Sequence, residues 1–279
     1  MKIAITGTTG LFGHGLQRVF AQQRQEVIPL PHARLELTDR AAVFKALEEA
    51  APDLLVHPAG TPDIDQCELE PQQCWKTNVE ATRNLCDAAA RFGFGVAFIS
   101  TDAVFDGEKK TPYVESDPTN PPTEYGRSKV AAEALVKHLP RHWIFRVSVL
   151  FGPGKTNFVE KGIEKLRQGE EYAVAVDQMG SATYTIDAAQ TILRVCESAP
   201  SGMYHLSNFG ACSRYELACE AARLAGLDGS KIIGRPMSAM RRPAVRLKYS
   251  VMEMAALKAA GIPLPRSWQA ALKEYVKGL

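Results

Sequence analysis

The chain has 279 residues, of which 46% are hydrophobic and 23% charged, and its formal net charge is +2. This composition is typical of a globular protein with one large domain or two modest ones, and the small charge gives no reason to expect a nucleic acid or an acidic membrane as partner. No apolar run approaches the roughly 18 residues that a membrane span needs, and the N-terminus resembles a first strand rather than a signal peptide. We therefore expect a cytoplasmic protein. The six cysteines lack zinc spacing, so we expect reduced thiols and no metal site.

Short apolar runs alternate with helical patterns in the first half of the chain. The predicted strands are 2–6, 26–30, 54–57, 96–100 and 143–147, and the predicted helices are 11–22, 41–49, 71–91 and 128–137. Strands that alternate with helices form a parallel sheet with helices on both faces. The predicted fold class is therefore α/β, a Rossmann-type doubly wound parallel sheet. The proline-rich residues 106–122 are expected to form a long ordered or lid-like loop.

The pattern loosens after about residue 150. The later predicted elements are a helix at 158–168, a strand at 172–176, a helix at 186–197, a strand at 204–207 and a last helix at 268–276. Ser213 and Glu216 have the spacing of a capping box, which predicts a helix start there. We expect residues 1–150 to form a dinucleotide-binding domain, completed by 183–210. Residues 151–279 are expected to form a smaller C-terminal α/β part that binds the substrate.

A glycine-rich turn separates the first predicted strand from the first predicted helix. Its spacing is Gly-x-x-Gly-x-x-Gly rather than Gly-x-Gly-x-x-Gly. Glycines let a pyrophosphate approach the backbone, and the N–H groups of a helix N-terminus bind it. We therefore expect this turn to hold a dinucleotide, the alternative being a plain strand-to-helix connection. The residues concerned are Gly7, Gly10, Leu11, Phe12 and Gly13.

The residues after the second predicted strand bear on which dinucleotide binds. An acidic residue there would hydrogen-bond the ribose of NAD, but residues 28–34 contain no acid. Arg34 could instead meet the 2′-phosphate of NADPH. The sequence thus favours NADPH, with NADH still open, and the alternative is that Arg34 is only solvated.

Three side chains have the chemistry of a carbonyl reductase. Tyr125 and Lys129 are four residues apart, so on a helix they share one face. A nearby ammonium favours the phenolate and would lower the pKa of Tyr125 from about 10, which would make it a proton donor near neutral pH. Thr101 ends the fourth predicted strand, where ligands of open α/β sheets bind. Its hydroxyl could orient a carbonyl, or it could satisfy the local backbone.

Seven runs of the sequence carry a resemblance to a known family. They are Ser100–Gly107, Pro112–Glu115, Tyr125–Lys129, Phe151–Val159, Asp177–Tyr184, Tyr204–Asn208 and Tyr249–Met252. These runs are similar to those of dTDP-4-dehydrorhamnose reductases, within the extended short-chain dehydrogenases/reductases, and they follow the family's order along the chain. The resemblance implies an oxidoreductase of dTDP-rhamnose biosynthesis with Thr101, Tyr125 and Lys129 as catalytic triad. It implies further cofactor contacts from Glu36, Leu37, Ala59 and Ser100, and substrate contacts from Thr101, Asp102, Asn157, Gln178 and Arg246.

The sequence departs from the family at positions that face the sugar or the cofactor. Ala103 stands where the family has a tyrosine that holds the sugar, and Val149 stands where it often has a tryptophan. His57 lies in place of a family amide, and we expect a buried histidine with satisfied hydrogen bonds rather than a ligand. The departures lie at substrate and cofactor contacts, whereas the three residues of the triad match the family.

The resemblance implies NAD(P)H-dependent reduction of a nucleotide-linked 4-keto-6-deoxy sugar, with Tyr125 as the proton donor. A 4,6-dehydratase is disfavoured, because Ala103 stands where that enzyme needs an acid. Two alternatives stay open. The first is an epimerase, which uses the same triad and retains its cofactor. The second is a non-catalytic dinucleotide-binding subunit similar to the regulatory β-subunit of methionine adenosyltransferase. A homodimer is also left open.

Overall fold

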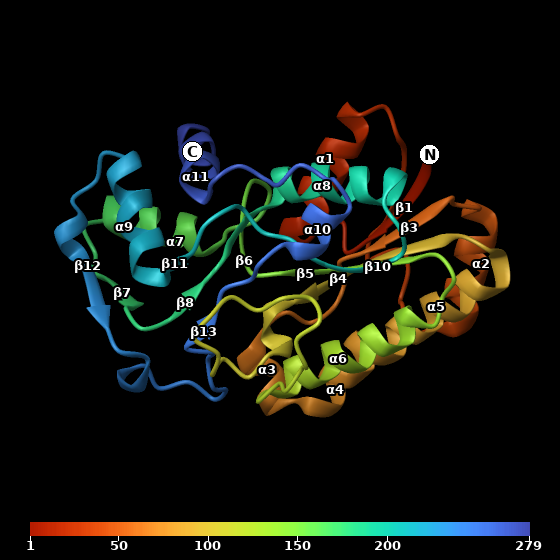
Figure 1. Cartoon of the computed structure of the whole chain (residues 1–279), viewed down its shortest axis with the longest axis horizontal. Coiled ribbons are helices and arrows are strands. Elements are labelled where there is room, and N and C mark those ends of the chain that lie inside the picture. Colours follow the sequence, from red (N-terminus) through yellow and green to blue (C-terminus); the bar gives the residue numbers. More distant parts are fainter.

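Six parallel strands form the main sheet of the protein (Figure 1). The computed structural model describes residues 1–279. The strands are β1 (Lys2–Thr6), β2 (Glu26–Leu30), β3 (Leu54–His57), β4 (Gly95–Thr101), β5 (His142–Val147) and β10 (Gly202–His205). Their spatial order is β10-β5-β4-β3-β1-β2. Since β2 and β3 lie on opposite sides of β1, the strand order reverses at β1, and such a switch point is where open α/β sheets bind ligands.

Helices cover both faces of this sheet, as Figure 1 shows. Alternation along β1 directs Ile3 and Ile5 to one face and Ala4 to the other. The first face packs against α1 (Leu11–Gln22), α8 (Thr185–Ser198) and α10 (Ala255–Ala259). The second packs against α2 (Arg40–Ala50), α5 (Ala81–Phe92) and α6 (Glu124–Lys137). The predicted Rossmann-type α/β fold is therefore confirmed.

Two predicted helices differ from the observed ones. The segment predicted as a single helix over 71–91 consists of α4 (Pro71–Trp75), a π-helical turn (Lys76–Glu80) and α5. The helix predicted from Ser128 begins at Glu124, because the Thr123 side chain accepts a hydrogen bond from the Gly126 N–H at 3.1 Å and caps it. Tyr125 consequently lies in the first turn of α6.

The smaller part of the molecule contains short sheets and three longer helices, on the left of Figure 1. β8 (Met179–Gly180) lies between β11 (Cys212–Ser213) and β13 (Tyr249–Ser250); β7 (Tyr172–Ala175) pairs with β12 (Ile232–Arg235), and β6 (Val149–Phe151) with β9 (Ala182–Tyr184). The helices are α7 (Phe158–Arg167), α9 (Arg214–Leu224) and α11 (Trp268–Lys277), while the short α3 (Ile64–Leu69) precedes α4. The predicted capping box at α9 is present, with Ser213 and Glu216 exchanging hydrogen bonds.

The loop at residues 106–122 is tied to the C-terminal part of the chain. The Tyr113 N–H donates to the Val251 carbonyl at 2.8 Å, and the Tyr113 hydroxyl donates to Asp106 at 2.7 Å. The Tyr113 ring also stacks on Phe105, with centroids 4.1 Å apart. The sequence predicted either an ordered loop or a lid. These contacts indicate an ordered loop.

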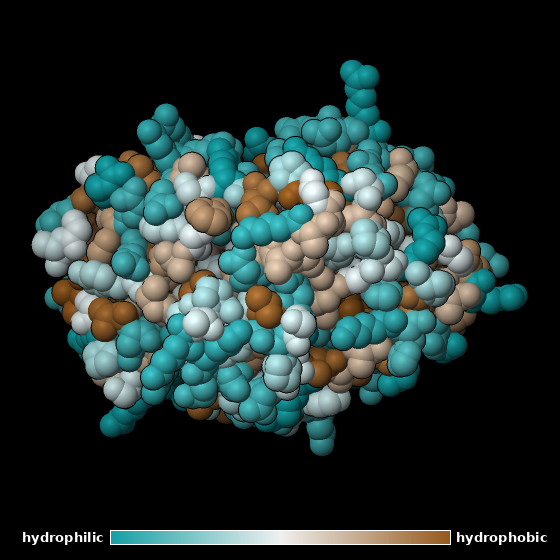
Figure 2. Space-filling model, in the orientation of Figure 1, coloured by the Kyte–Doolittle hydropathy of each residue, from teal (hydrophilic) through white to brown (hydrophobic).

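The surface drawn in Figure 2 is mostly hydrophilic, with hydrophobic residues scattered over it. No helix is both long and apolar enough to span a bilayer. No three His, Cys, Asp or Glu side chains are grouped so that they could hold a metal ion.

Candidate active site

The turn between β1 and α1 requires glycine at two positions. Gly7 has φ +57°, and a Cβ there would lie 2.9 Å from the Cα of Ala59. A Cβ at Gly13 would lie 2.2 Å from the carbonyl oxygen of Gly7. No side chain caps α1 at Gly10, so the first N–H groups of the helix, at Leu11–Gly13, remain available at its electropositive end. The turn has the features that bind a pyrophosphate.

The segment after β3 lies against this turn through Ala59. His57, at the end of β3, is fully buried, with Nδ1 2.8 Å from the Thr6 hydroxyl and Nε2 3.1 Å from the Thr82 hydroxyl. Because Thr82 donates its own proton to the Asn78 carbonyl, it accepts from His57 Nε2–H. Burial lowers the pKa of His57 to about 3, so the ring is neutral. The expectation of a satisfied core histidine is confirmed.

The turn after β2 presents a free guanidinium. Arg34 is exposed and forms no ion pair or side-chain hydrogen bond, whereas Glu36 accepts hydrogen bonds from the N–H and hydroxyl of Thr38 at 3.0 and 2.8 Å. The Leu37 carbonyl accepts from the Asn84 amide at 2.9 Å. Glu36 and Leu37 therefore shape the turn, and Arg34 is the group that is left to meet an anion.

Thr101 and Tyr125 meet at the carboxyl edge of the sheet. The Thr101 hydroxyl accepts from the Ala103 N–H and donates to Asp102 Oδ1, both at 3.1 Å. Burial raises the pKa of the half-buried Tyr125, while a hydrogen bond with Thr101 acts in the opposite direction. Two hydroxyls thus lie together where a carbonyl oxygen could be held.

Lys129 lies one turn along α6 from Tyr125, as predicted, but its ammonium is directed at the sheet. Its Nζ donates to the Ile99 carbonyl at 2.7 Å and lies 4.0 Å from the centroid of the Phe98 ring. Burial lowers the pKa of Lys129 to about 7, and the charge of Glu133 opposes this effect. The prediction that Lys129 lowers the pKa of Tyr125 is wrong for this structure, because burial dominates and raises it.

Ser100 lies next to Thr101 but faces the interior. Its hydroxyl donates to Glu133 Oε1 at 2.6 Å, and Glu133 also pairs with Arg146 through two hydrogen bonds of 2.9 and 2.7 Å. Both side chains of this ion pair are almost fully buried. The Ser100 hydroxyl is therefore committed to the interior, and only its backbone remains as a cofactor contact.

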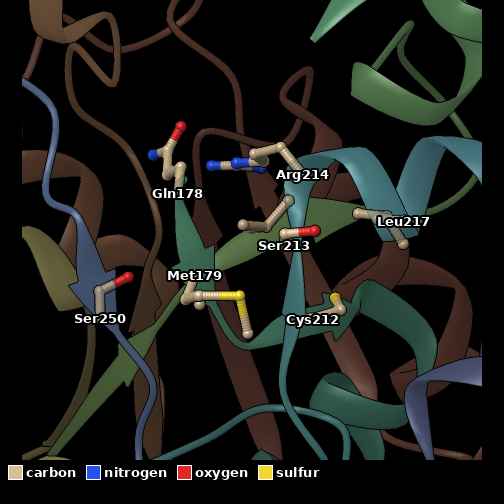
Figure 3. Close-up of a pocket in the computed structure, with 9 residues that line it drawn as sticks. Gln178, Met179, Cys212, Ser213, Arg214, Leu217 and Ser250 are labelled. Atoms are coloured by element: carbon tan, nitrogen blue, oxygen red, sulfur yellow. The ribbon is translucent and has the colours of Figure 1, made fainter. Parts of the chain in front are cut away.

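Two of the predicted substrate residues lie at the boundary with the smaller part of the molecule. Asp102 accepts from the Ser148 hydroxyl at 2.5 Å. Gln178, just before β8, lines a small pocket with Arg214 and Ser250 (Figure 3), and its side chain makes no hydrogen bond. Both residues are placed where they could meet a substrate that reaches Thr101.

Asn157 has a different role from the one expected. Its Oδ1 accepts from the Val159 N–H at 3.0 Å and caps α7. Its Nδ2 donates to the Gly152 carbonyl at 3.0 Å and to the Tyr275 hydroxyl at 2.6 Å. Since both ends of the amide are used internally, the prediction of a substrate-binding side chain is replaced by that of a helix cap.

Arg246 is also committed within the protein. Its two terminal nitrogens donate to the two carboxylate oxygens of Asp65 at 3.0 and 2.7 Å, and one of them also donates to the Ala244 carbonyl at 2.9 Å. This bidentate pair ties the segment before β13 to α3. The guanidinium expected to meet a substrate phosphate is therefore neutralised in this structure.

A free arginine that the sequence analysis did not single out is Arg214. It is the first residue of α9, and its guanidinium carbon lies 5.4 Å from the centroid of the Phe158 ring. It forms no ion pair, and Figure 3 shows its side chain extending toward Gln178. Arg214 lies within the capping-box pattern that begins at Ser213, but that pattern was interpreted only as a helix start.

Asn78 is a second residue that the sequence analysis missed. It lies in the π-helical turn, where its Oδ1 accepts from the Thr61 N–H at 2.8 Å and its Nδ2 donates to the Ser128 hydroxyl at 3.0 Å. It thereby joins the segment after β3 to the helix that carries Tyr125. π-turns of this kind occur frequently at functional sites.

Comparisons with known proteins identify the family of this chain. The whole chain, residues 1–279, matches the family described as RmlD substrate binding domain. The chain belongs to this family. The resemblance to dTDP-4-dehydrorhamnose reductases is thereby confirmed.

Several known proteins resemble this chain over nearly its full length. It is 36% identical to a dTDP-4-dehydrorhamnose reductase of Streptomyces griseus, over 99% of this chain and 93% of that protein. It is 35% identical to the spore coat polysaccharide biosynthesis protein SpsK of Bacillus subtilis (strain 168), over 99% and 97%. The crystal structure of dTDP-4-dehydrorhamnose reductase from Bacillus anthracis str. Ames in complex with NADP covers 100% of both chains, with a TM-score of 0.96 at 30% identity.

Proposed function

We propose that this RmlD-family protein is an NADPH-dependent reductase of a nucleotide-linked 4-keto-6-deoxy sugar. The observation that carries the proposal is the meeting of Thr101 and Tyr125 at the carboxyl end of β4, in a chain that belongs to this family along its whole length. The names of two relatives support the same reaction class, because both are named as reductases of dTDP-linked keto sugars.

The residues at the strand edge fit a phosphorylated dinucleotide. The glycine turn leaves the first N–H groups of α1 uncapped, and Ala59 lies against Gly7. Arg34 is exposed and unpaired, which suits a 2′-phosphate better than a neutral ribose. When bound, NADPH would supply the hydride. The pyrophosphate would lie over Gly10, Leu11 and Phe12.

The side chains around the reacting carbonyl have complementary roles. Burial keeps Tyr125 protonated at neutral pH, which is the state that a proton donor requires. Thr101 would turn its hydroxyl proton from Asp102 to the ketone oxygen and hold it, and Tyr125 would transfer its proton to that oxygen as the alkoxide forms. Lys129 uses one N–H on the Ile99 carbonyl and has two further donors for a cofactor ribose.

The test is NADPH oxidation with a panel of nucleotide-linked 4-keto-6-deoxy sugars. Stoichiometric loss of NADPH with formation of a 6-deoxyhexose is expected. Sugar interconversion without net NADPH loss would identify an epimerase. Tight NADPH binding without turnover of any substrate would refute the reductase proposal in favour of a binding subunit.

A further inference from the structure

We propose that Arg214 holds the diphosphate of the nucleotide sugar, at a subsite formed by the starts of α9 and β8. The proposal rests on the proposed function for the identity of the substrate, and it assigns a residue that the family resemblance did not point to. Its basis is a guanidinium that lines a pocket and has no partner, while the arginine expected for this task is occupied.

Arg214 is unusual among the partly or fully buried arginines of this protein. Arg146 and Arg246 each form a two-hydrogen-bond pair with a carboxylate, at distances of 2.7–3.0 Å. Arg214 has no ion pair and no side-chain hydrogen bond, although a partly desolvated cation without a partner is costly. An anionic ligand would remove this cost, because a guanidinium matches the oxygens of a phosphate with two parallel hydrogen bonds.

The surroundings of Arg214 leave it open to such an anion. Its pocket is a small hollow of about 10 Å³, which holds about one water molecule, so a phosphate would lie at the mouth beside the guanidinium. The unbonded Gln178 amide lies at the same place (Figure 3). Burial lowers the pKa of Arg214, while the charge of Asp102 raises it and that of Arg242 lowers it to a smaller extent.

A chain of contacts joins the pocket to the proposed carbonyl site. Asp102 follows Thr101 and binds Ser148, whose hydroxyl lies 3.6 Å from the position of a Cβ on Gly180, and Gly180 lines the pocket. The subsite is thus one layer of side chains away from the proposed carbonyl site. A sugar bound at Thr101 would extend its diphosphate toward Arg214 rather than toward Arg246, which is held by Asp65.

The experiment measures dTDP, dTMP and thymidine binding by calorimetry in the parent, Arg214→Met and Arg235→Met. Methionine keeps an apolar stem against Phe158 and removes the charge. Arg235 is an exposed residue of the neighbouring β12 with no bonded partner, so its variant matches the loss of charge. Loss of a charge-assisted contact should weaken dTDP binding about 10- to 100-fold in Arg214→Met, with thymidine and NADPH unaffected and Arg235→Met like the parent.

An unchanged dTDP affinity in Arg214→Met would overturn the proposal. If that variant does not fold, the parent itself still tests it: dTDP should protect Arg214 from an arginine-specific dicarbonyl reagent, as mapped by mass spectrometry, and an equal reaction rate with and without dTDP would refute the subsite. Failure of the reductase function would be seen separately, as a parent that binds dTDP but does not oxidise NADPH with any keto sugar.

Discussion

Lys129 should reduce the stability of the ligand-free protein at neutral pH. It is 5% exposed, and burial lowers its pKa from 10.5 to about 7. Between these two pH values the unfolded chain holds a proton on Lys129 that the folded protein does not. The free energy of unfolding therefore rises with pH across this window, and the cost of burying the charge is fully present below about pH 7.

The magnitude follows from the same shift. One pKa unit corresponds to about 1.4 kcal/mol, so the charged form costs at most about 5 kcal/mol below the folded pKa. The hydrogen bond to the Ile99 carbonyl and the contact with Phe98 already stabilise the charged form. Lys129→Met replaces the amine with an unbranched apolar side chain of similar length. We expect the free energy of unfolding of this variant to exceed that of the parent by about 2–4 kcal/mol at pH 7. This difference should decrease by about 2–3 kcal/mol between about pH 7.5 and 9.5.

The assay is urea unfolding of parent and variant at several pH values, without cofactor. Buried thiols such as Cys86 and Cys212, whose pKa values are raised by burial, titrate in the same range with the opposite sign in both proteins. The measured quantity is therefore the difference between the free energies of unfolding of parent and variant. The reasoning would be refuted if the variant were less stable than the parent at pH 7. It would also be refuted if the difference between their free energies of unfolding did not change with pH, because burial would then not disfavour the charged form of Lys129.

Three further predictions concern the proposed reaction and its cofactor. Tyr125→Phe should lower the rate of reduction about 10²–10⁴-fold with NADPH binding unchanged, and equal rates in steady-state assays would eliminate Tyr125 as proton donor. Gly10→Val should abolish NADPH binding in fluorescence titrations. The variant should still fold, because Gly10 has φ −84° and no backbone atom lies closer than 3.2 Å to its added Cβ. Retained binding would mean that the pyrophosphate lies elsewhere. Arg34→Ala should remove a preference for NADPH over NADH of about 1.5–3 kcal/mol, whereas an unchanged affinity ratio would indicate a merely solvated arginine.

Local sequence patterns were sufficient for the main elements of the fold. The helix predicted at 11–22 is α1 to the residue, and the strands of the main sheet were found within a residue or two because buried parallel strands are continuous apolar runs. The errors lie where tertiary contacts override local preference. The π-turn at Lys76–Glu80 carries Asn78 into hydrogen bonds with Thr61 and Ser128, which no helical periodicity could indicate.

The candidate site divides in the same way. Tyr125 and Lys129 share a helix, so their relation could be inferred from spacing alone. The direction of the Lys129 ammonium could not, because it depends on the Ile99 carbonyl of a strand 30 residues away in sequence. The sequence also could not distinguish Arg246 from Arg214. The first is neutralised by Asp65, 181 residues away, and the second has no such partner.

The sequence by itself determined the order of strands and helices, the glycine turn and the presence of a Tyr-x-x-x-Lys pair, because these depend on periodicity and on backbone geometry within a few residues. Only the tertiary structure decided which polar side chains remain free to meet a ligand. Asn157 and Arg246 have suitable chemistry, but Asn157 caps a helix and Arg246 binds a carboxylate. The side chains of Arg34 and Arg214 have no hydrogen-bond partner in the protein. A charge or amide becomes a binding group only if folding leaves it without a partner, and the partners come from distant parts of the chain.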